Sequence, residues 1–118
     1  MSPAATTIAK GVKYVTLVNV FVVEPAKQQR LVKVLVEATE TTMRHLPGFI
    51  SANIHQSLDG TRVVNYAQWR SVDDFQAMLK NPEAIPHMQQ AASLAASFDP
   101  KLYDVVEVCN IHEPWSQA

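Results

Sequence analysis

An amide and an indole share one face of a predicted strand. The segment 63–69 has the composition of a β-strand, yet it includes Asn65. Asn is disfavoured in strands, and a buried amide without hydrogen-bond partners costs about 1–3 kcal/mol. Because side chains alternate along a strand, Asn65, Ala67 and Trp69 point the same way. Four strand residues span roughly 13 Å at about 3.3 Å each, so this face could line a slot for a flat polycyclic aromatic molecule.

A second isolated amide occurs in the apolar segment 13–23. Asn19 is expected on the face that carries Leu17 and Phe21. Either Asn alone could bond to backbone at a bulge or a sheet edge, and Trp69 alone could belong to the core or to an interface. Asn19, Asn65 and Trp69 together favour a ligand site.

The sequence has no motif of metal or nucleotide chemistry. It lacks His-Glu-x-x-His, Cys-x-x-Cys, Gly-x-Gly-x-x-Gly, a Walker loop and a Gly-x-Ser-x-Gly elbow. No two of its four His residues have the i, i+4 ligand spacing, so no metal site is predicted. The net charge is −1, with no basic stripe, which argues against a nucleic-acid partner.

The elements that must position these residues can be read from periodicity and from turn residues. Strands are predicted at 13–23, 49–57, 61–70 and 102–111. A helix is predicted from Pro25 to His45. A helix capped by Ser71 follows the third strand and is interrupted at Asn81-Pro82 and Pro86. A second helical segment is predicted at 87–98. The first helix has an apolar stripe formed by Leu31, Val34, Leu35, Ala38 and Thr42.

This order, β-α-β-β-α-β, predicts an α+β ferredoxin-like fold with an antiparallel four-stranded sheet and helices on one face. The first strand then lies antiparallel to the third, which could bring Asn19 and Asn65 together. We expect one domain over 13–111, with flexible tails at 1–12 and 112–118.

Both faces of the first strand are apolar, although the helices can cover only one face of the sheet. An uncovered apolar face usually marks an interface, so a homodimer packed sheet to sheet is predicted. The alternative is a second face covered by the tails and by long polar side chains.

The cytoplasm is the expected compartment. The single Cys109 cannot form an internal disulfide. No apolar run approaches the roughly 20 residues of a membrane span, and residues 1–11 lack the pattern of a secretory signal.

Two stretches resemble the antibiotic biosynthesis monooxygenase family. They are Val64-Asn65-Tyr66-Ala67-Gln68-Trp69, followed by a helix that opens Ser71-Val72-Asp73-Asp74-Phe75, and Leu46-Pro47-Gly48-Phe49 at the start of the second strand. The resemblance covers roughly residues 14–108. It implies a dimeric α/β barrel of ferredoxin-like subunits.

The resemblance also implies a reaction. Some members oxidise anthrone or hydroquinone polyketides to quinones with O2 and without metal, flavin or haem, using a first-strand Asn, a third-strand Asn and a Trp four residues later. Asn19, Asn65 and Trp69 match these positions as catalytic residues. Substrate contacts are expected from Leu17, Phe21, Ala67, Phe75, Met78, His87 and Met88.

Three questions stay open at this point. The substrate proton could pass to water or to His87, which could equally be a solvated or capping residue. The chain could instead be a haem-degrading monooxygenase of the same superfamily, with His87 as the iron ligand. It could also be a non-enzymatic dimeric binding protein or a subunit that stabilises a larger oxygenase.

Overall fold

Four strands form one antiparallel sheet, in the order β2-β3-β1-β4. The computed structural model describes residues 4–111 of the chain, so the predicted tail at 112–118 and residues 1–3 lie outside the described part. The strands are β1 (Val15–Val22), β2 (Phe49–Gln56), β3 (Arg62–Trp69) and β4 (Ser97–Tyr103). The predicted ferredoxin-like topology is confirmed.

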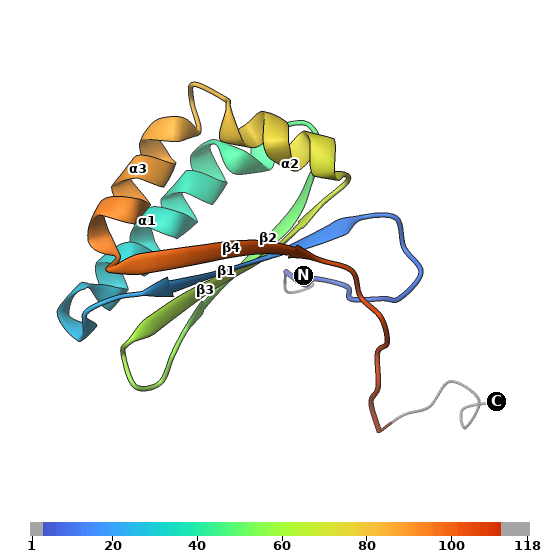
Figure 1. The fold of residues 1–118 in the computed structure, drawn as a ribbon, viewed down its shortest axis with the longest axis horizontal. Helices are drawn as coiled ribbons and strands as arrows, with labels where there is room; N and C mark the ends of the chain where they lie inside the picture. Colours follow the sequence, from blue (N-terminus) through green and yellow to red (C-terminus); the bar gives the residue numbers. More distant parts are fainter. Residues whose placement is uncertain (1–3, 112–118) are drawn as a thin grey trace.

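The helices α1 (Gln28–Thr41), α2 (Val72–Leu79) and α3 (Ile85–Leu94) lie together on one face of this sheet (Figure 1). Short 3-10 turns, η1 (Pro25–Lys27) and η2 (Met43–His45), flank α1. The Ser71 hydroxyl accepts a hydrogen bond from the Asp74 N–H at 3.1 Å, as expected of an N-cap. Among residues 4–111, no helix is long and apolar enough to cross a membrane.

The predicted last strand at 102–111 is wrong, because β4 begins at Ser97. Asp99-Pro100 indicated a break, but Pro100 lies on the edge strand, where a missing N–H removes no bond from the interior of the sheet. The helix predicted at 87–98 is correspondingly displaced, since α3 spans Ile85–Leu94. Residues 104–111 lead away from the sheet without regular structure (Figure 1).

The strand register places the two amides side by side. In the antiparallel pair of β1 and β3, Asn19 lies opposite Asn65 and Leu17 opposite Ala67. On the other side of β1, Asn19 is opposite Pro100 of β4. The expected adjacency of Asn19 and Asn65 is therefore confirmed.

The sheet face away from the helices is partly covered by the N-terminal segment. Gln68 of β3 is buried there; its Nε2 donates to the Thr7 carbonyl and its Oε1 accepts from the Ser51 hydroxyl, both at 2.8 Å. The Thr6 hydroxyl donates to Asn53 Oδ1 at 2.8 Å. Part of this face is thus covered by the N-terminal segment of the same chain. Such cover was the alternative to a sheet-to-sheet dimer.

A tight contact fixes the start of β2 against α2. Gly48 has φ +83°, and a Cβ at this position would overlap the Asp74 carboxyl group. Arg70 Nε and Nη2 donate to that carboxyl at 2.8 and 2.9 Å. These bonds, with a further one from the Ser71 hydroxyl, lower the pKa of Asp74. The glycine of Leu46-Pro47-Gly48 is therefore required by packing as well as by the turn.

Candidate active site

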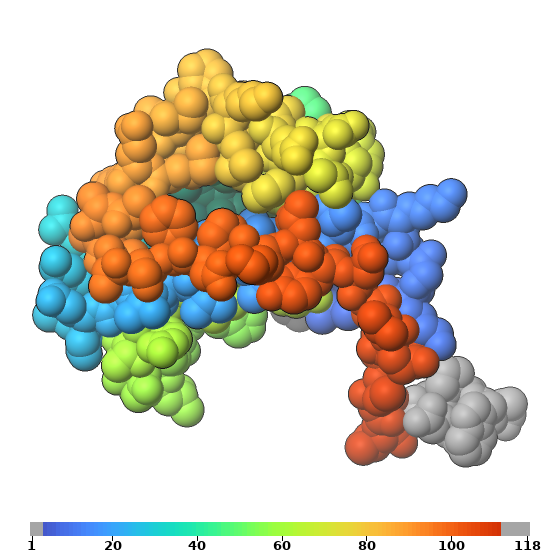
Figure 2. Space-filling view, viewed as in Figure 1, coloured from blue at the N-terminus to red at the C-terminus, as the bar shows by residue number. Residues whose placement is uncertain are grey.

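A cavity of about 180 Å³ lies between the helices and the sheet. Its floor consists of β1 and β3 with part of β2, and its walls come from α1, η2, α2, α3 and β4. The space-filling view shows a hollow between β4 and the helices α2 and α3 (Figure 2). Phe98 and Pro100 of β4 line the cavity, and Phe98 is 51% exposed. The edge strand β4 therefore forms one rim of the opening.

The rung formed by Asn19 and Asn65 interrupts the hydrophobic core. On one side of this rung, Leu17 and Ala67 belong to a cluster under α2. On the other side, Phe21 and Val63 belong to a second cluster, packed against α1. The cavity takes lining residues from both clusters. The two amides therefore sit in the floor of the cavity, where ordinary packing would place apolar side chains.

Both amide oxygens of this rung are buried and have no hydrogen-bond partner among the described residues. An unpaired buried acceptor costs about 1–3 kcal/mol, and most buried polar groups in folded proteins are paired. Rotation of each amide exchanges its oxygen with its NH2 group. Asn19 and Asn65 can thus present either two acceptors or two donor groups to a polar atom in the cavity.

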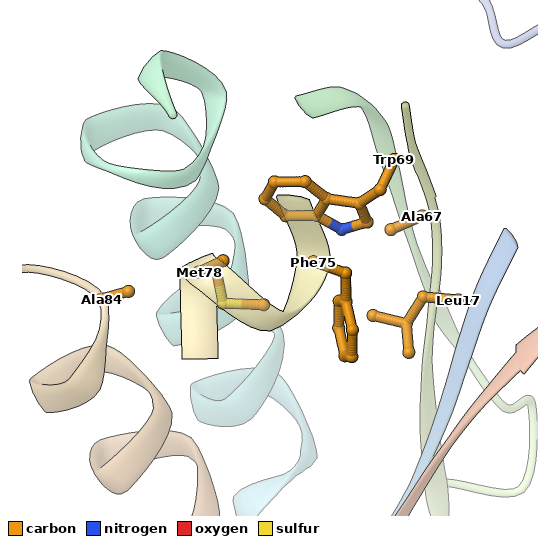
Figure 3. Packing of buried hydrophobic residues seen from close by; sticks show 6 residues of the cluster. All are labelled: Leu17, Ala67, Trp69, Phe75, Met78 and Ala84. Atoms are coloured by element: carbon orange, nitrogen blue, oxygen red, sulfur yellow. The ribbon is translucent and has the colours of Figure 1, made fainter. Parts of the chain in front are cut away.

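Trp69 forms an aromatic wall at one end of the cavity. Its side chain is 2% exposed and meets Phe49 edge to face, with ring centroids 5.5 Å apart and an interplanar angle of 89°. Phe75 lies 6.3 Å from it at 68°. Figure 3 shows the indole nitrogen on the edge of the ring that faces Phe75 and Leu17. Trp69 is therefore a core residue that also contributes to the cavity, which combines the two roles considered for it.

The cavity is apolar apart from a few side chains. Its lining contains no Asp, Glu, Lys or Arg, and its polar side chains are Asn19, Thr39, Asn65 and His87, apart from the indole N–H. Thr39 already donates to the Leu35 carbonyl at 2.9 Å. No group of three or more His, Cys, Asp or Glu residues within 4–111 could hold a metal ion. The two amides and His87 are the groups best placed to orient a ligand.

His87 lies in the first turn of α3, and its Nε2 is 3.0 Å from the hydroxyl of Thr42. Thr42 follows α1 and is 7% exposed. The hydrogen bond joins the ends of two helices across the cavity wall. His87 is thus a partly buried, hydrogen-bonded residue of the cavity.

All ten residues predicted for the site line this one cavity: Leu17, Asn19, Phe21, Asn65, Ala67, Trp69, Phe75, Met78, His87 and Met88. Their shared location says nothing about which of them act in a reaction, so the catalytic roles of Asn19, Asn65 and Trp69 remain predictions.

Sequence reasoning missed several residues around the cavity. Phe98 and Pro100 were missed because β4 was placed too late in the chain. Phe49 also went unassigned. Thr42 was counted only as part of the apolar stripe of the first helix. A hydroxyl at an otherwise apolar stripe position was the signal that could have marked Thr42.

The chain is similar to known proteins over most of its length. The family model described as antibiotic biosynthesis monooxygenase matches residues 14–93. Tetracenomycin-F1 monooxygenase of Streptomyces glaucescens is 51% identical over 89 residues, which cover 75% of this chain and 80% of the relative.

Two solved structures share the fold. The monooxygenase ActVA-Orf6 of Streptomyces coelicolor, in complex with the ligand nanaomycin D, is 30% identical with a TM-score of 0.73, covering 86% of this chain and 94% of its own. SnoaB, a cofactor-independent oxygenase from Streptomyces nogalater, is 25% identical with a TM-score of 0.69, covering 82% and 97%.

Proposed function

Because this chain belongs to the antibiotic biosynthesis monooxygenase family and is a monooxygenase, we propose that it oxidises an anthrone- or hydroquinone-type polycyclic substrate to a quinone. The oxidant is O2, and no metal, flavin or haem takes part. The names of the relatives support both points: one oxidises tetracenomycin F1, one binds nanaomycin D, and one is a cofactor-independent oxygenase.

The single observation that carries the proposal is the pair of unpartnered amides in an apolar cavity. An anthrone loses a proton from carbon to give an anion whose charge resides largely on oxygen. The amide NH2 groups of Asn19 and Asn65 would donate to this oxygen as the charge develops. One well-placed donor of this kind is worth about 3 kcal/mol in the transition state.

The substrate itself supplies the electrons. The anion passes one electron to O2, which gives a substrate radical and superoxide. The two recombine at the carbon that lost the proton, forming a peroxide. The second proton on that carbon then leaves, the O–O bond breaks, and water departs. A CH2 group and O2 thereby become a carbonyl and water.

Trp69 contacts the substrate directly in this scheme. Its indole fills the end of the cavity beside Phe75 (Figure 3) and would hold one edge of a flat substrate by aromatic contact. The indole N–H is a donor for the substrate oxygen or the peroxide. Trp69→Phe keeps the aromatic volume but removes this donor, so it should lower kcat while the protein stays folded.

Oxygen uptake tests the proposal. Protein stripped of metals with a chelator is mixed with 1,8-dihydroxyanthrone in an oxygen electrode, and the rate is compared with the spontaneous oxidation. We expect enzymatic uptake that Asn65→Ala lowers about 10²-fold. A rate no higher than the spontaneous one would refute the proposal. Substrate binding without oxygen uptake would favour the non-enzymatic alternative.

The haem-degrading alternative needs an imidazole nitrogen of His87 on iron. In this chain His87 Nε2 is hydrogen bonded to Thr42, so only Nδ1 is left as a ligand atom. Titration with hemin separates the two functions. We expect no Soret shift that depends on His87. A shift in the wild-type protein that disappears in His87→Ala would support the haem function.

We also propose that two copies associate through the sheet face opposite the helices. The β1 residues Val18, Val20 and Val22 on this face are only half-buried, and Tyr103 of β4 is 51% exposed beside them. The N-terminal contacts cover the β2–β3 side of the face instead. Light scattering should give the mass of a dimer, and Val20→Lys should give a folded monomer. A wild-type monomer would contradict this proposal.

The cytoplasm is the proposed compartment. Cys109 is exposed and unpaired, a state that a reducing compartment maintains. Cell fractionation with an antibody against the chain would test this, and recovery from a secreted fraction would contradict it.

A further inference from the structure

His87 is the polar residue of the cavity that the proposed role of the amides leaves unused. Its ring lies in the cavity wall, and its one hydrogen bond among residues 4–111 joins Nε2 to the Thr42 hydroxyl at 3.0 Å. The chemistry of this residue depends on which ring nitrogen carries the proton, because neutral imidazole has one donor and one acceptor nitrogen. The hydrogen bonds of Thr41 and Thr42 allow the tautomer with the proton on Nε2.

The Thr42 hydroxyl can donate to Nε2 or accept from it, and the contacts of Thr41 bear on that choice. Thr41 Oγ1 donates its proton to the Glu37 carbonyl at 2.7 Å. Thr41 Oγ1 also lies 3.5 Å from Thr42 Oγ1. With its own proton committed, Thr41 can only accept in this second contact, so its oxygen is open to the Thr42 proton. When Thr42 donates there, its oxygen accepts from His87 and the imidazole proton lies on Nε2.

This direction leaves Nδ1 of His87 with a free lone pair. Nδ1 makes no hydrogen bond among the described residues, and the ring belongs to the same cavity as Asn19 and Asn65. A neutral imidazole that is held by one nitrogen and open at the other is the arrangement of a general base. The other polar groups of the cavity, amide and hydroxyl, are far weaker bases.

We propose that His87 takes the proton from the substrate carbon and that Thr42 is a positioning residue that fixes its tautomer. The inference rests on the proposed function, since it concerns the same substrate. In the first step the C–H bond breaks, its electron pair stays on the substrate as the anion, and the proton forms an N–H bond at Nδ1.

The same proton can serve the later steps. The imidazolium returns it to the peroxide anion formed with O2. Nδ1 then takes the second proton from the carbon as the O–O bond breaks, and gives it to the departing hydroxide to form water. His87 ends neutral, so the overall reaction needs no other acid or base.

Charged groups near His87 lie on the outside of the molecule. On the α1 side, Glu40 and Arg44 bind each other at 2.8 Å and are exposed. Glu83, just before α3, is also exposed. From α2 the cavity receives Phe75, Met78 and Leu79, and the polar side chains that the sheet contributes are the two amides. Among the described residues, no Asp, Glu, Lys or Arg side chain lines the cavity with His87.

An anaerobic experiment isolates the proton transfer from the oxidation. Without oxygen, 1,8-dihydroxyanthrone is mixed with the protein and its anion is followed by visible absorbance. We expect the wild type to form the bound anion at neutral pH, and His87→Gln to lower the anion formation rate about 10²-fold. His45→Gln, which replaces an exposed histidine, is the matched control and should behave as wild type.

Two variants at position 42 separate positioning from packing. Thr42→Val keeps the shape but removes the hydroxyl, so it should slow anion formation about tenfold, the worth of one hydrogen bond. Thr42→Ser retains the hydroxyl and should restore the rate. Equal rates in Thr42→Val and the wild type would show that the tautomer is not set by Thr42.

A pH series gives a readout that a merely structural role would not change. The wild-type rate should fall on the acidic side, where imidazole is protonated. His87→Gln should lose this dependence and approach the wild type at alkaline pH, where the free anthrone ionises by itself. A constant ratio of the two rates at all pH values would overturn the assignment of His87 as the base.

Failure of the inference and failure of the proposed function give different results. An anion that forms through His87 but does not react on addition of O2 would refute the oxygenase function but leave His87 as the base. Quinone formation at the wild-type rate in His87→Gln would refute the role of His87 as the base but leave the oxygenase function standing. A probe that neither binds nor reacts would overturn both.

Discussion

Replacing Asn65 by leucine should stabilise the fold while it removes most of the activity. The Asn65 amide oxygen is buried without a partner among the described residues, which costs about 1–3 kcal/mol. Leucine has a similar branched shape and brings no polar atom, and the cavity beside it has room for the larger group. The free energy of unfolding should therefore rise by roughly 1–3 kcal/mol, with each kcal/mol worth roughly 4 °C in Tm.

The matched control is on the same strand and the opposite face. Gln68 is 2% exposed, and its amide accepts a hydrogen bond from the Ser51 hydroxyl and donates one to the Thr7 carbonyl. Gln68→Leu leaves both of these groups unpaired, so it should lower the free energy of unfolding by about 1–3 kcal/mol. Two buried amides three residues apart should thus respond to the same substitution with opposite signs.

Urea unfolding at fixed protein concentration measures both variants, and oxygen uptake with 1,8-dihydroxyanthrone measures activity. Asn65→Leu should lower kcat about 10²-fold, because it removes a donor to the developing oxyanion. If Asn65→Leu lowered the free energy of unfolding as much as Gln68→Leu, the Asn65 amide would have to be hydrogen bonded in the folded protein. Retained activity in Asn65→Leu would show that its amide has no catalytic role.

Two further predictions concern the turns that hold the strands. Gly48→Ala should lower the free energy of unfolding by roughly 1–3 kcal/mol, since Gly48 has a positive φ and a Cβ there overlaps the Asp74 carboxyl. Gly11→Ala, also at positive φ but with open space around it, is the control in urea unfolding, and an equal loss would rule out the clash. The pKa of Asp59 is lowered to about 2, first by the hydrogen bond from the Thr61 side chain. The stabilisation from Asp59 is therefore present above pH 4 and lost as the pH falls from about 4 to 2. The stability of Asp59→Asn should not show this loss between pH 4 and 2 in acid unfolding. Identical acid unfolding curves for the variant and the wild type would contradict the prediction.

The part of the site that follows from strand geometry could be predicted from the sequence. Alternation placed Asn65 and Trp69 on one face, and the β-α-β-β-α-β order placed β1 beside β3. These two rules together predicted that Asn19 and Asn65 meet, and the register confirms it. Neither step needed knowledge of side-chain packing, because both follow from the backbone.

The parts that could not be predicted depend on contacts between distant segments. Pro100 was interpreted as a break because its tolerance of an edge strand depends on the strand order of the whole sheet. The partner of Thr42 lies 45 residues away in α3, and no local pattern indicates it. The cover that residues 6 and 7 give to the second sheet face was considered only as the alternative to a dimer, because their main-chain and hydroxyl contacts leave no hydrophobic signal.

Isotope labelling of the product is the most direct test of a cofactor-free oxygenase. Metal-stripped protein is supplied with ¹⁸O2 and 1,8-dihydroxyanthrone, and the quinone is analysed by mass spectrometry at early times, with the spontaneous reaction subtracted. We predict one ¹⁸O atom in each quinone molecule formed by the enzyme, at an undiminished rate in the presence of chelator. An enzymatic quinone that carries only ¹⁶O, or a rate that returns only when a metal or haem is added, would contradict the proposed function.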